Sequence, residues 1–160
     1  MLTISKYTSP VGMLTLASDE NALTGLWIEG QKYFGSGLRL DAAREGENAV
    51  LTAAARWLDR YFAGERPAPG ALPVAPAGSA FRRRVLDALV EIPSGEVVTY
   101  GELAARLGSS ARAVGGAVGH NPISIIIPCH RVVGADGSLT GYAAGVEAKR
   151  RLLRLEGVQV

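Results

Sequence analysis

The chain has 160 residues, 48% of them apolar, and a net charge of +2, which permits one large or two small domains and excludes a polybasic tail protein. Its single cysteine excludes an internal disulfide and favours a reducing compartment, and one cysteine with two histidines makes no zinc-binding motif. There is no signal-peptide pattern, and no apolar run approaches the ~20 residues that cross a bilayer. We therefore expect a soluble cytoplasmic protein with no membrane partner.

The first half of the chain predicts a small antiparallel sheet followed by a helix. Three strands in a meander are expected: residues 2–7, 13–17 and 23–28. Residues 30–46, which are rich in glycine, are expected to form a loop. Apolar residues at helical spacing then predict a helix over residues 49–62, which Gly64 ends. No chemistry is expected in this half, and its large aromatic residues are interpreted as packing residues: Trp27, Trp57 and Tyr61.

Four prolines between residues 65 and 78 predict a semi-rigid connector and a boundary between two domains, residues 1–75 and 76–160. The first domain has seven Lys/Arg against eight Asp/Glu, a net charge of −1, and the second has ten against seven, a net charge of +3. The basicity of the second domain fits a nucleic-acid-binding face, but it also fits ordinary surface variation. Ser79 is expected to cap an amphipathic helix that follows the connector.

Residues 99–119 have the pattern of a helix-turn-helix. The first helix is expected over residues 100–107, with Thr99 as its N-cap, and the second over residues 111–119. Two interior glycines of the second helix, at positions 115 and 116, each cost about 1 kcal/mol relative to alanine. Close approach of another molecule and close packing inside the protein account for these glycines equally well.

The only cysteine lies in the most informative stretch of the chain, residues 125–133, directly before one of the two histidines. The β-branched residues before Pro128 predict a buried extended segment, so we expect Cys129 and His130 at the end of a buried strand. A histidine can take the proton of a thiol, whose ordinary pKa is about 8.5, and so generate a thiolate nucleophile. An inert buried cysteine is the alternative, and it is the commoner outcome for a Cys-His pair without further motifs.

The flanking residues supply such motifs. Asn121-Pro122, followed six residues later by Pro128-Cys129-His130-Arg131-Val132, closely resembles the active site of the O6-alkylguanine-DNA alkyltransferases, also called methylated-DNA–protein-cysteine methyltransferases. The resemblance covers about residues 81–157 and extends more loosely over the N-terminal half. It implies an α+β fold: a small N-terminal antiparallel sheet domain with a helix, of ribonuclease H-like type, and a mostly helical C-terminal domain. The latter is expected to be winged helix-turn-helix-like and to carry the active-site cysteine.

The resemblance also implies a function. The expected partner is double-stranded DNA containing O6-alkylguanine, bound through its minor groove, and O4-alkylthymine is a further candidate substrate. The damaged nucleotide is flipped out of the helix, and its alkyl group passes irreversibly to Cys129 in a single turnover, without a cofactor. We expect a monomer, and cooperative binding along DNA stays open. The implied catalytic residues are Cys129, His130, Glu156, Asn121 and Tyr100.

Two further sets of residues follow from the resemblance. The expected DNA-binding residues are Arg112, Ala111, Ala113, Gly115 and Tyr100. Among them, Arg112 matches the arginine that fills the gap left by the flipped nucleotide. The expected substrate-pocket residues are Tyr142, Ala143, Ala144, Val118 and Val132. Most family members have glycine where this chain has Ala144, which predicts a narrower pocket mouth.

Three other classes of function are weighed against this one. A non-catalytic lesion-binding protein of the same fold has no need of a thiol, so the retention of Cys129 with His130 and Glu156 argues against it. A helix-turn-helix regulator reads bases, whereas the second helix here is poor in base-reading side chains. A cysteine hydrolase is the third class, and titration with methylated DNA against ester substrates separates it from an alkyltransferase.

Overall fold

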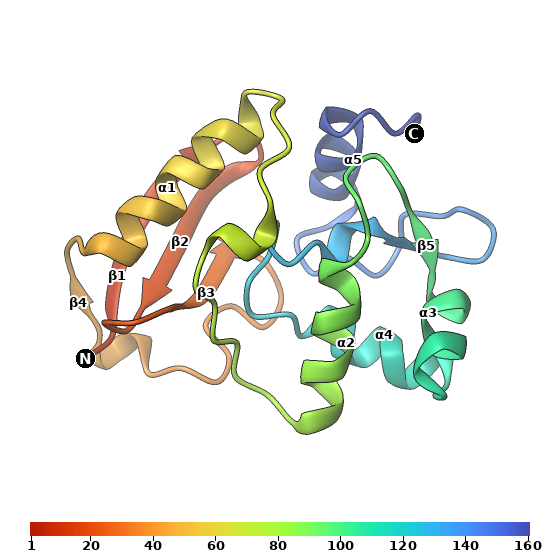
Figure 1. Cartoon of the computed structure of the whole chain (residues 1–160), viewed down its shortest axis with the longest axis horizontal. Helices are drawn as coiled ribbons and strands as arrows, with labels where there is room; N and C mark the ends of the chain where they lie inside the picture. Colours follow the sequence, from red (N-terminus) through yellow and green to blue (C-terminus); the bar gives the residue numbers. More distant parts are fainter.

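The computed structural model describes residues 1–160, which form two lobes that lie side by side (Figure 1). In the N-terminal lobe the helix α1 (Ala49–Phe62) lies across a sheet with the strand order β3-β2-β1-β4. The antiparallel strands of this sheet are β1 (Thr3–Ser9), β2 (Gly12–Ser18) and β3 (Leu23–Ile28). Gly12 has a φ of +114°, which permits the tight turn between the first two strands. The expected meander and helix are confirmed.

The expected loop over residues 30–46 contains two short elements. Leu40–Ala42 form the 3-10 turn η1, and Arg44–Glu45 form β4, which pairs in parallel with the start of β1. The Arg44 N–H donates to the carbonyl of Leu2 at 2.9 Å. The prediction of a loop is wrong at these positions, because two exposed polar residues show no alternation from which a strand could be recognised.

The proline-rich connector lies along the free edge of β3. The Leu23 N–H donates to the Pro73 carbonyl, and the Ala75 N–H donates to the Leu23 carbonyl, both at 2.8 Å. A 3-10 turn, η2 (Pro69–Ala71), precedes this contact. The connector is therefore packed on the N-terminal lobe, and the domain boundary between residues 75 and 76 stays a prediction.

The C-terminal lobe is mostly helical, as expected. Its helices are α2 (Ala80–Val90), α3 (Tyr100–Leu107), α4 (Ala111–Gly119) and α5 (Val146–Leu155). The hydroxyls of Ser79 and Thr99 accept backbone N–H groups at the starts of α2 and α3, which confirms the predicted caps, and Ser110 caps α4 in the same way. Helices α3 and α4 form the predicted helix-turn-helix. No helix of the protein has the length and the apolar character needed to cross a membrane.

Cys129 does not lie on a strand, so this expectation is wrong. It begins the 3-10 turn η3 (Cys129–Arg131), which leads into β6 (Val132–Val133), and β6 pairs in parallel with β5 (Val98–Thr99). The isoleucines before Cys129 are buried, but they form tight turns, with Ile125 in the left-handed region at φ +70°. The β-branched residues therefore reflect burial rather than strand pairing, because β propensity depends on context.

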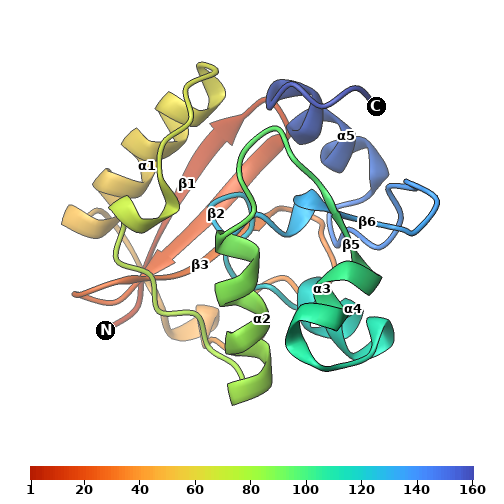
Figure 2. The same ribbon diagram turned by 45° about the vertical axis from the view of Figure 1, so that its right-hand side comes forward.

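The two lobes share one hydrophobic core. Residues 122–124 run beside β3, where the Leu26 N–H donates to the Pro122 carbonyl and the Ser124 N–H donates to the Leu26 carbonyl, both at 2.9 Å. The turns that lead to Cys129 are thus attached to the N-terminal sheet. Figure 2 shows this segment in cyan and light blue between the sheet and the C-terminal helices.

Candidate active site

The thiol of Cys129 is buried, with 5% of the residue exposed. Burial raises the pKa of this thiol to about 11, while the Asn121 side chain and the positive charge of Lys149 oppose the rise. The group is therefore a thiol at neutral pH. Because the thiolate is the reactive form, chemistry at this position requires a base nearby.

His130 is fully buried, and its ring is held by Glu156, with the ring Nε2 at 2.6 Å from the carboxylate Oε2. A carboxylate only accepts hydrogen bonds, so this contact puts the proton on Nε2 and the lone pair on Nδ1. Nδ1 is buried and makes no hydrogen bond with the protein. Burial lowers the pKa of His130 against the opposing effect of Glu156, so the ring is neutral and can accept a proton at Nδ1.

The Glu156 carboxylate accepts hydrogen bonds from three residues. Besides His130, the Tyr61 hydroxyl donates to Oε2 at 2.6 Å, and the Arg131 guanidinium donates from Nε to Oε1 at 2.7 Å and from Nη2 to Oε2 at 3.0 Å. Burial by itself would raise the pKa of Glu156, but the hydrogen bonds from His130 and Arg131, with the charge of Arg131 and of the His130 ring once it is protonated in acid, lower it to about 2. The carboxylate is thus ionised at neutral pH and fixes the tautomer of His130.

Two of these donors, Tyr61 and Arg131, were not among the predicted site residues. Tyr61 was interpreted as a packing residue, yet its hydroxyl reaches Glu156 across 95 positions of the chain. Arg131 is buried and also donates from Nη1 to the Ile92 carbonyl at 2.6 Å. No local sequence pattern predicts the contact of Tyr61 with Glu156. The position of Arg131 next to buried apolar residues such as Val132 could have indicated that this arginine is buried and paired.

Lys149 was also missed, because it was grouped with the exposed basic residues of the last helix. It is fully buried, and its Nζ donates to the carbonyl of Val132 at 2.5 Å and that of Thr140 at 3.4 Å. Burial lowers the pKa of Lys149 to about 8, and the nearby Cys129 opposes this change. The missed signal was spacing: Lys149 precedes the buried pair at positions 152 and 153 by one helical turn, so it shares their face.

Asn121 links the end of α4 to the turns before Cys129. Its Nδ2 donates to the carbonyls of Ile123 at 3.2 Å and Ile127 at 2.8 Å, and its Oδ1 accepts from the Ile123 N–H at 3.0 Å. These hydrogen bonds provide partners for buried backbone groups in a segment that belongs to no helix or strand. The geometry agrees with the expected tie between the second helix of the motif and the cysteine.

The expected pocket residues fall into two groups. Val118 and Val132 are core residues with 3% and 0% exposure. The segment Tyr142–Gly145, which we call the lid, is only partly buried at its first three residues. The hydroxyl of Tyr142 is buried without a hydrogen-bond partner.

Tyr100 stands against the start of the lid. A Cβ on Gly141, which has a φ of +89°, would lie 2.9 Å from the Tyr100 hydroxyl, so only glycine permits this approach. The ring of Tyr100 lies 5.9 Å from the Lys149 Nζ. Tyr100, Lys149 and the lid therefore surround one region. Burial raises the pKa of the Tyr100 hydroxyl, and the nearby Cys129 raises it further.

Helix α4 carries the expected DNA-binding residues except Tyr100, which begins α3. Ala111, Arg112 and Ala113 are exposed. A Cβ on Gly116 would meet nothing within 4 Å, and one on Gly115 would meet only the Tyr100 ring at 3.9 Å. Internal packing therefore does not require these two glycines, and close approach of another molecule stays the prediction for them.

A groove of about 530 Å³ runs beside α4 toward the start of α2. Arg82 and Arg112 both line it, together with the capping residues Ser79 and Ser110. Two guanidinium groups and two helix N-termini make this groove favourable for negative charge. It lies on the face that the predicted DNA-binding residues share.

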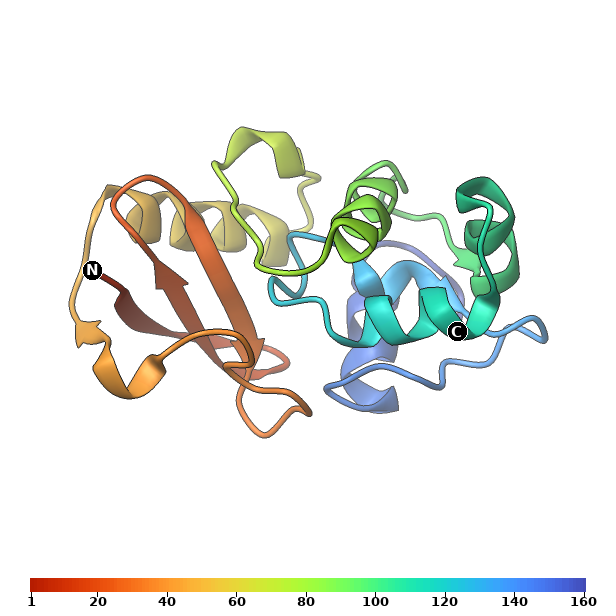
Figure 3. The same cartoon turned by 90° about the horizontal axis from the view of Figure 1, so that it is seen from below.

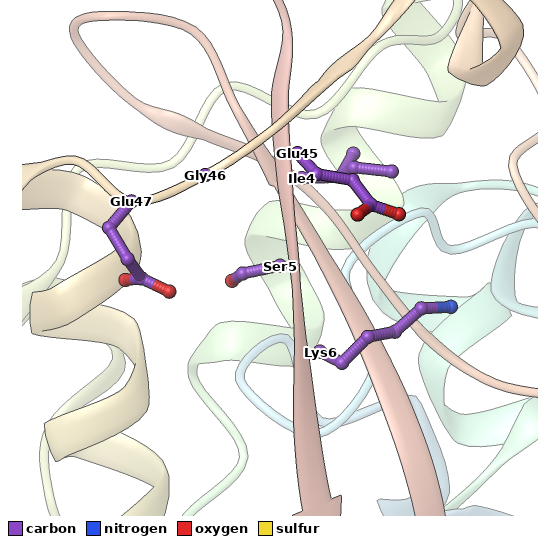
Figure 4. Close-up of a pocket in the computed structure, with 6 residues that line it drawn as sticks. All are labelled: Ile4, Ser5, Lys6, Glu45, Gly46 and Glu47. Carbon is purple, nitrogen blue, oxygen red and sulfur yellow. The ribbon is translucent and has the colours of Figure 1, made fainter.

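A separate hollow of about 250 Å³ lies at the edge of the N-terminal sheet (Figure 4). Ile4, Ser5 and Lys6 from β1 line it together with Glu45, Gly46 and Glu47, and the Glu45 side chain lies beside Ile4. None of the predicted site residues belongs to it, and Lys6 is paired with Glu29. No group of three His, Cys, Asp or Glu side chains is arranged to hold a metal ion.

Comparison with protein families accounts for both lobes. The ribonuclease-like domain of 6-O-methylguanine DNA methyltransferase matches residues 2–76, and the DNA binding domain of the same enzyme matches residues 80–158. The fold and the site thus define a DNA-repair alkyltransferase. The chain belongs to the 6-O-methylguanine DNA methyltransferase family, which confirms the resemblance seen in the sequence.

Individual relatives agree over nearly the whole length. The methylated-DNA–protein-cysteine methyltransferase of Haemophilus influenzae is 45% identical, over 95% of this chain and 84% of its own. That of Mycolicibacterium paratuberculosis is 44% identical, over 98% of this chain and 93% of its own. The structure of Mycobacterium tuberculosis OGT in complex with DNA superposes with a TM-score of 0.86 at 42% identity, over 96% of this chain and 92% of that one. The roles of the individual site residues stay predictions.

Proposed function

We propose that the protein repairs O6-alkylguanine in double-stranded DNA by moving the alkyl group to Cys129, once per molecule. The observation that carries this proposal is the buried thiol directly before His130, whose ring is fixed by Glu156 at 2.6 Å while Nδ1 keeps its lone pair. A protein that only bound the lesion would have no use for this arrangement. The relatives named above act on methylated DNA, which agrees with it.

The proton and the alkyl group follow separate paths. His130 takes the thiol proton at Nδ1, directly or through a water, and the Glu156 carboxylate stabilises the imidazolium. The Cys129 thiolate attacks the alkyl carbon, so a C–S bond forms as the C–O6 bond breaks, and the electron pair passes into the guanine. Tyr100 then donates a proton to the leaving base at N3. The positive charge of Lys149 supports the thiolate, since it opposes the rise in the pKa of Cys129.

The product is a thioether, which no group in the site is suited to cleave. The protein therefore acts in a single irreversible turnover and needs no cofactor. Each molecule is consumed by one lesion, so its amount and not its turnover limits repair.

The DNA is bound by the helix-turn-helix, with α4 in the minor groove. The small residues of α4, Ala111, Ala113 and Gly115, permit close approach, and Arg112 enters the stack in place of the flipped nucleotide. Flipping is needed because the alkyl group cannot be reached inside the duplex, and it costs a few kcal/mol of unstacking. The M. tuberculosis relative of known structure is in complex with DNA, and residues 80–158 match the family's DNA binding domain, which supports DNA as the partner of this lobe.

The flipped base packs against the Tyr142 side chain and faces the backbone of the lid. The Ala143 N–H is proposed to donate to the guanine O6, and Ala144 narrows the mouth of the pocket. O4-alkylthymine is a second substrate on the same reasoning, because it also presents an alkylated oxygen. We further propose residues 1–75 and 76–160 as two domains of a cytoplasmic monomer, packed on each other through the shared core.

A labelled-methyl assay tests this function. Duplex DNA with O6-methyl-labelled guanine, duplex DNA with methyl-labelled O4-methylthymine, and a labelled ester are each incubated with the wild type and with Cys129→Ser. We expect label on the wild-type protein from the guanine substrate and none on Cys129→Ser. Release of free label from the ester, with no label on the protein, would instead identify a cysteine hydrolase.

A further inference from the structure

Four consecutive residues after β3, Gln31–Phe34, connect the N-terminal sheet to the candidate site, and we call them the strap. Figure 3 shows this orange loop extending from the sheet toward the C-terminal lobe. The sequence predicted that these residues lie in a loop without a catalytic or binding role. Each of the four residues makes a separate contact. Gln31 and Phe34 contact the N-terminal lobe, and Lys32 and Tyr33 contact the C-terminal lobe.

The first and last residues of the strap are its anchors. The buried side chain of Gln31 accepts from the Ile28 N–H at 2.8 Å and donates to the Lys32 carbonyl at 3.3 Å. The Phe34 ring packs on Trp27, with ring centres 5.6 Å apart. Both ends of the strap are therefore held on β3 and its continuation.

The two middle residues reach the other lobe. The Lys32 N–H donates to the carbonyl of Ala143, in the lid, at 3.1 Å. The Tyr33 ring stacks on His120, directly after α4, with ring centres 3.8 Å apart and planes 25° apart. His120 is itself fixed to α4, since its Nδ1 lies 2.8 Å from the Gly116 carbonyl. The strap thus touches the lid and the DNA-binding helix at once.

The backbone of Tyr33 supports a specific role for this contact. Its φ is +59°, in the left-handed region, which is unfavourable for a residue other than glycine. Its side chain is 51% exposed, so core packing does not account for it. The turn itself contributes to holding this backbone, since the Ser36 N–H donates to the Tyr33 carbonyl at 3.0 Å. The half-exposed ring is held by its stacking on His120.

We infer that the strap fixes the distance between the lid and α4, and that Tyr33 is a positioning residue for repair in duplex DNA. The inference rests on the proposed function. Helix α4 holds the duplex while the lid walls the pocket for the flipped base, so transfer requires both at a fixed separation. A misplacement of about 1 Å can cost about a hundredfold in rate. A free base needs the pocket but not α4.

Tyr33→Asn tests the inference, because asparagine tolerates the left-handed conformation but removes the ring. Tyr33→Phe is the matched control, since it keeps the ring. We measure single-turnover methyl transfer from duplex O6-methylguanine and from free O6-methylguanine base. For Tyr33→Asn we expect a loss of about tenfold on duplex, with the free-base rate within about twofold of wild type. Tyr33→Phe should match the wild type on both substrates.

His120→Ala provides a second variant and a double-mutant cycle. It should reproduce the selective loss on duplex, and adding Tyr33→Asn to it should cause little further loss, because both changes remove one contact. Equal losses on duplex and free base, additive losses, or no loss would each overturn the inference. Absence of methyl transfer by the wild type would instead reject the proposed function, so the two failures are distinguishable.

Discussion

Glu156 is the residue on which the proposed chemistry depends most. It accepts two hydrogen bonds from Arg131 and one each from His130 and Tyr61, and its pKa is lowered to about 2. A carboxylate held in this way cannot take the proton from His130. Its role is to keep the ring oriented and to balance the charge that the ring acquires, as in other nucleophile–histidine–carboxylate systems.

Replacement of Glu156 by glutamine should therefore slow alkyl transfer by about two to four orders of magnitude. DNA affinity should change little, because Glu156 is buried away from the DNA-binding face. Single-turnover rates and binding isotherms measure the two effects. Glu147→Gln, on an exposed residue of α5, the helix that ends directly before Glu156, is the matched control. An unchanged rate for Glu156→Gln would show that another group orients His130.

Ala144 should set the size of the alkyl group that the protein accepts. A methyl lesion enters the pocket regardless of the Ala144 side chain, whereas a benzyl group must lie along the lid. We expect efficient methyl transfer and slow reaction with O6-benzylguanine. Ala144→Gly should restore much of the benzyl reaction and leave methyl repair almost unchanged, as second-order rates for both substrates would show. Fast benzyl transfer by the wild type, or equal acceleration of both substrates, contradicts the steric argument.

At the scale of elements, local sequence patterns were enough for the helices and not for the turns. The caps Ser79 and Thr99 and the apolar spacing of α1 act within a few residues, so the sequence alone predicted them. The turn at Cys129 depends on the side chain of Asn121 and on pairing with β3, which local propensity does not encode. β4 was missed for the same reason, since it exists only through its pairing with β1.

The glycines of α4 give an element-scale prediction. A Cβ on Gly116 meets nothing within 4 Å, so Gly116→Ala should stabilise the free protein by about 1 kcal/mol and raise its Tm by about 2–4 °C. The same change should weaken DNA binding and duplex repair, because it adds a methyl to the surface that approaches the groove. Thermal melts and binding isotherms test both effects.

A matched control for this prediction is Gly70→Ala, in η2, where a Cβ also meets nothing within 4 Å. It should leave DNA affinity unchanged. Unchanged DNA affinity for Gly116→Ala as well would mean that the small residues of α4 are not there for close approach.

At the scale of the whole molecule, the N-terminal lobe takes part in the site. The sequence predicted that the second half of the chain carries the chemistry and that the first half carries none. Tyr61 hydrogen-bonds to Glu156 from α1, and the strap contacts both the lid and His120. Contacts between positions this far apart leave no periodic or local mark in the chain, so only the folded structure reveals them.

The contacts of Glu156 with His130 and Arg131 should appear in acid stability. The pKa of Glu156 lies near 2 in the folded protein against 4.5 for a free side chain, so its contribution is complete above pH 4.5 and is lost as the pH falls toward 2. The wild type should lose about 2 kcal/mol more free energy of unfolding than Glu156→Gln between pH 4.5 and pH 3. Chemical denaturation at a series of pH values measures this, and parallel pH profiles would contradict it.

The central claim is that Cys129 accepts one alkyl group and is never regenerated. The most direct measurement is intact-protein mass spectrometry after incubation with excess duplex DNA containing O6-methylguanine, followed by peptide mapping. The account predicts one added methyl per molecule, located on Cys129, and no addition to Cys129→Ser. Repair of more lesions than there are protein molecules, or a methyl group mapped to another residue, would contradict it.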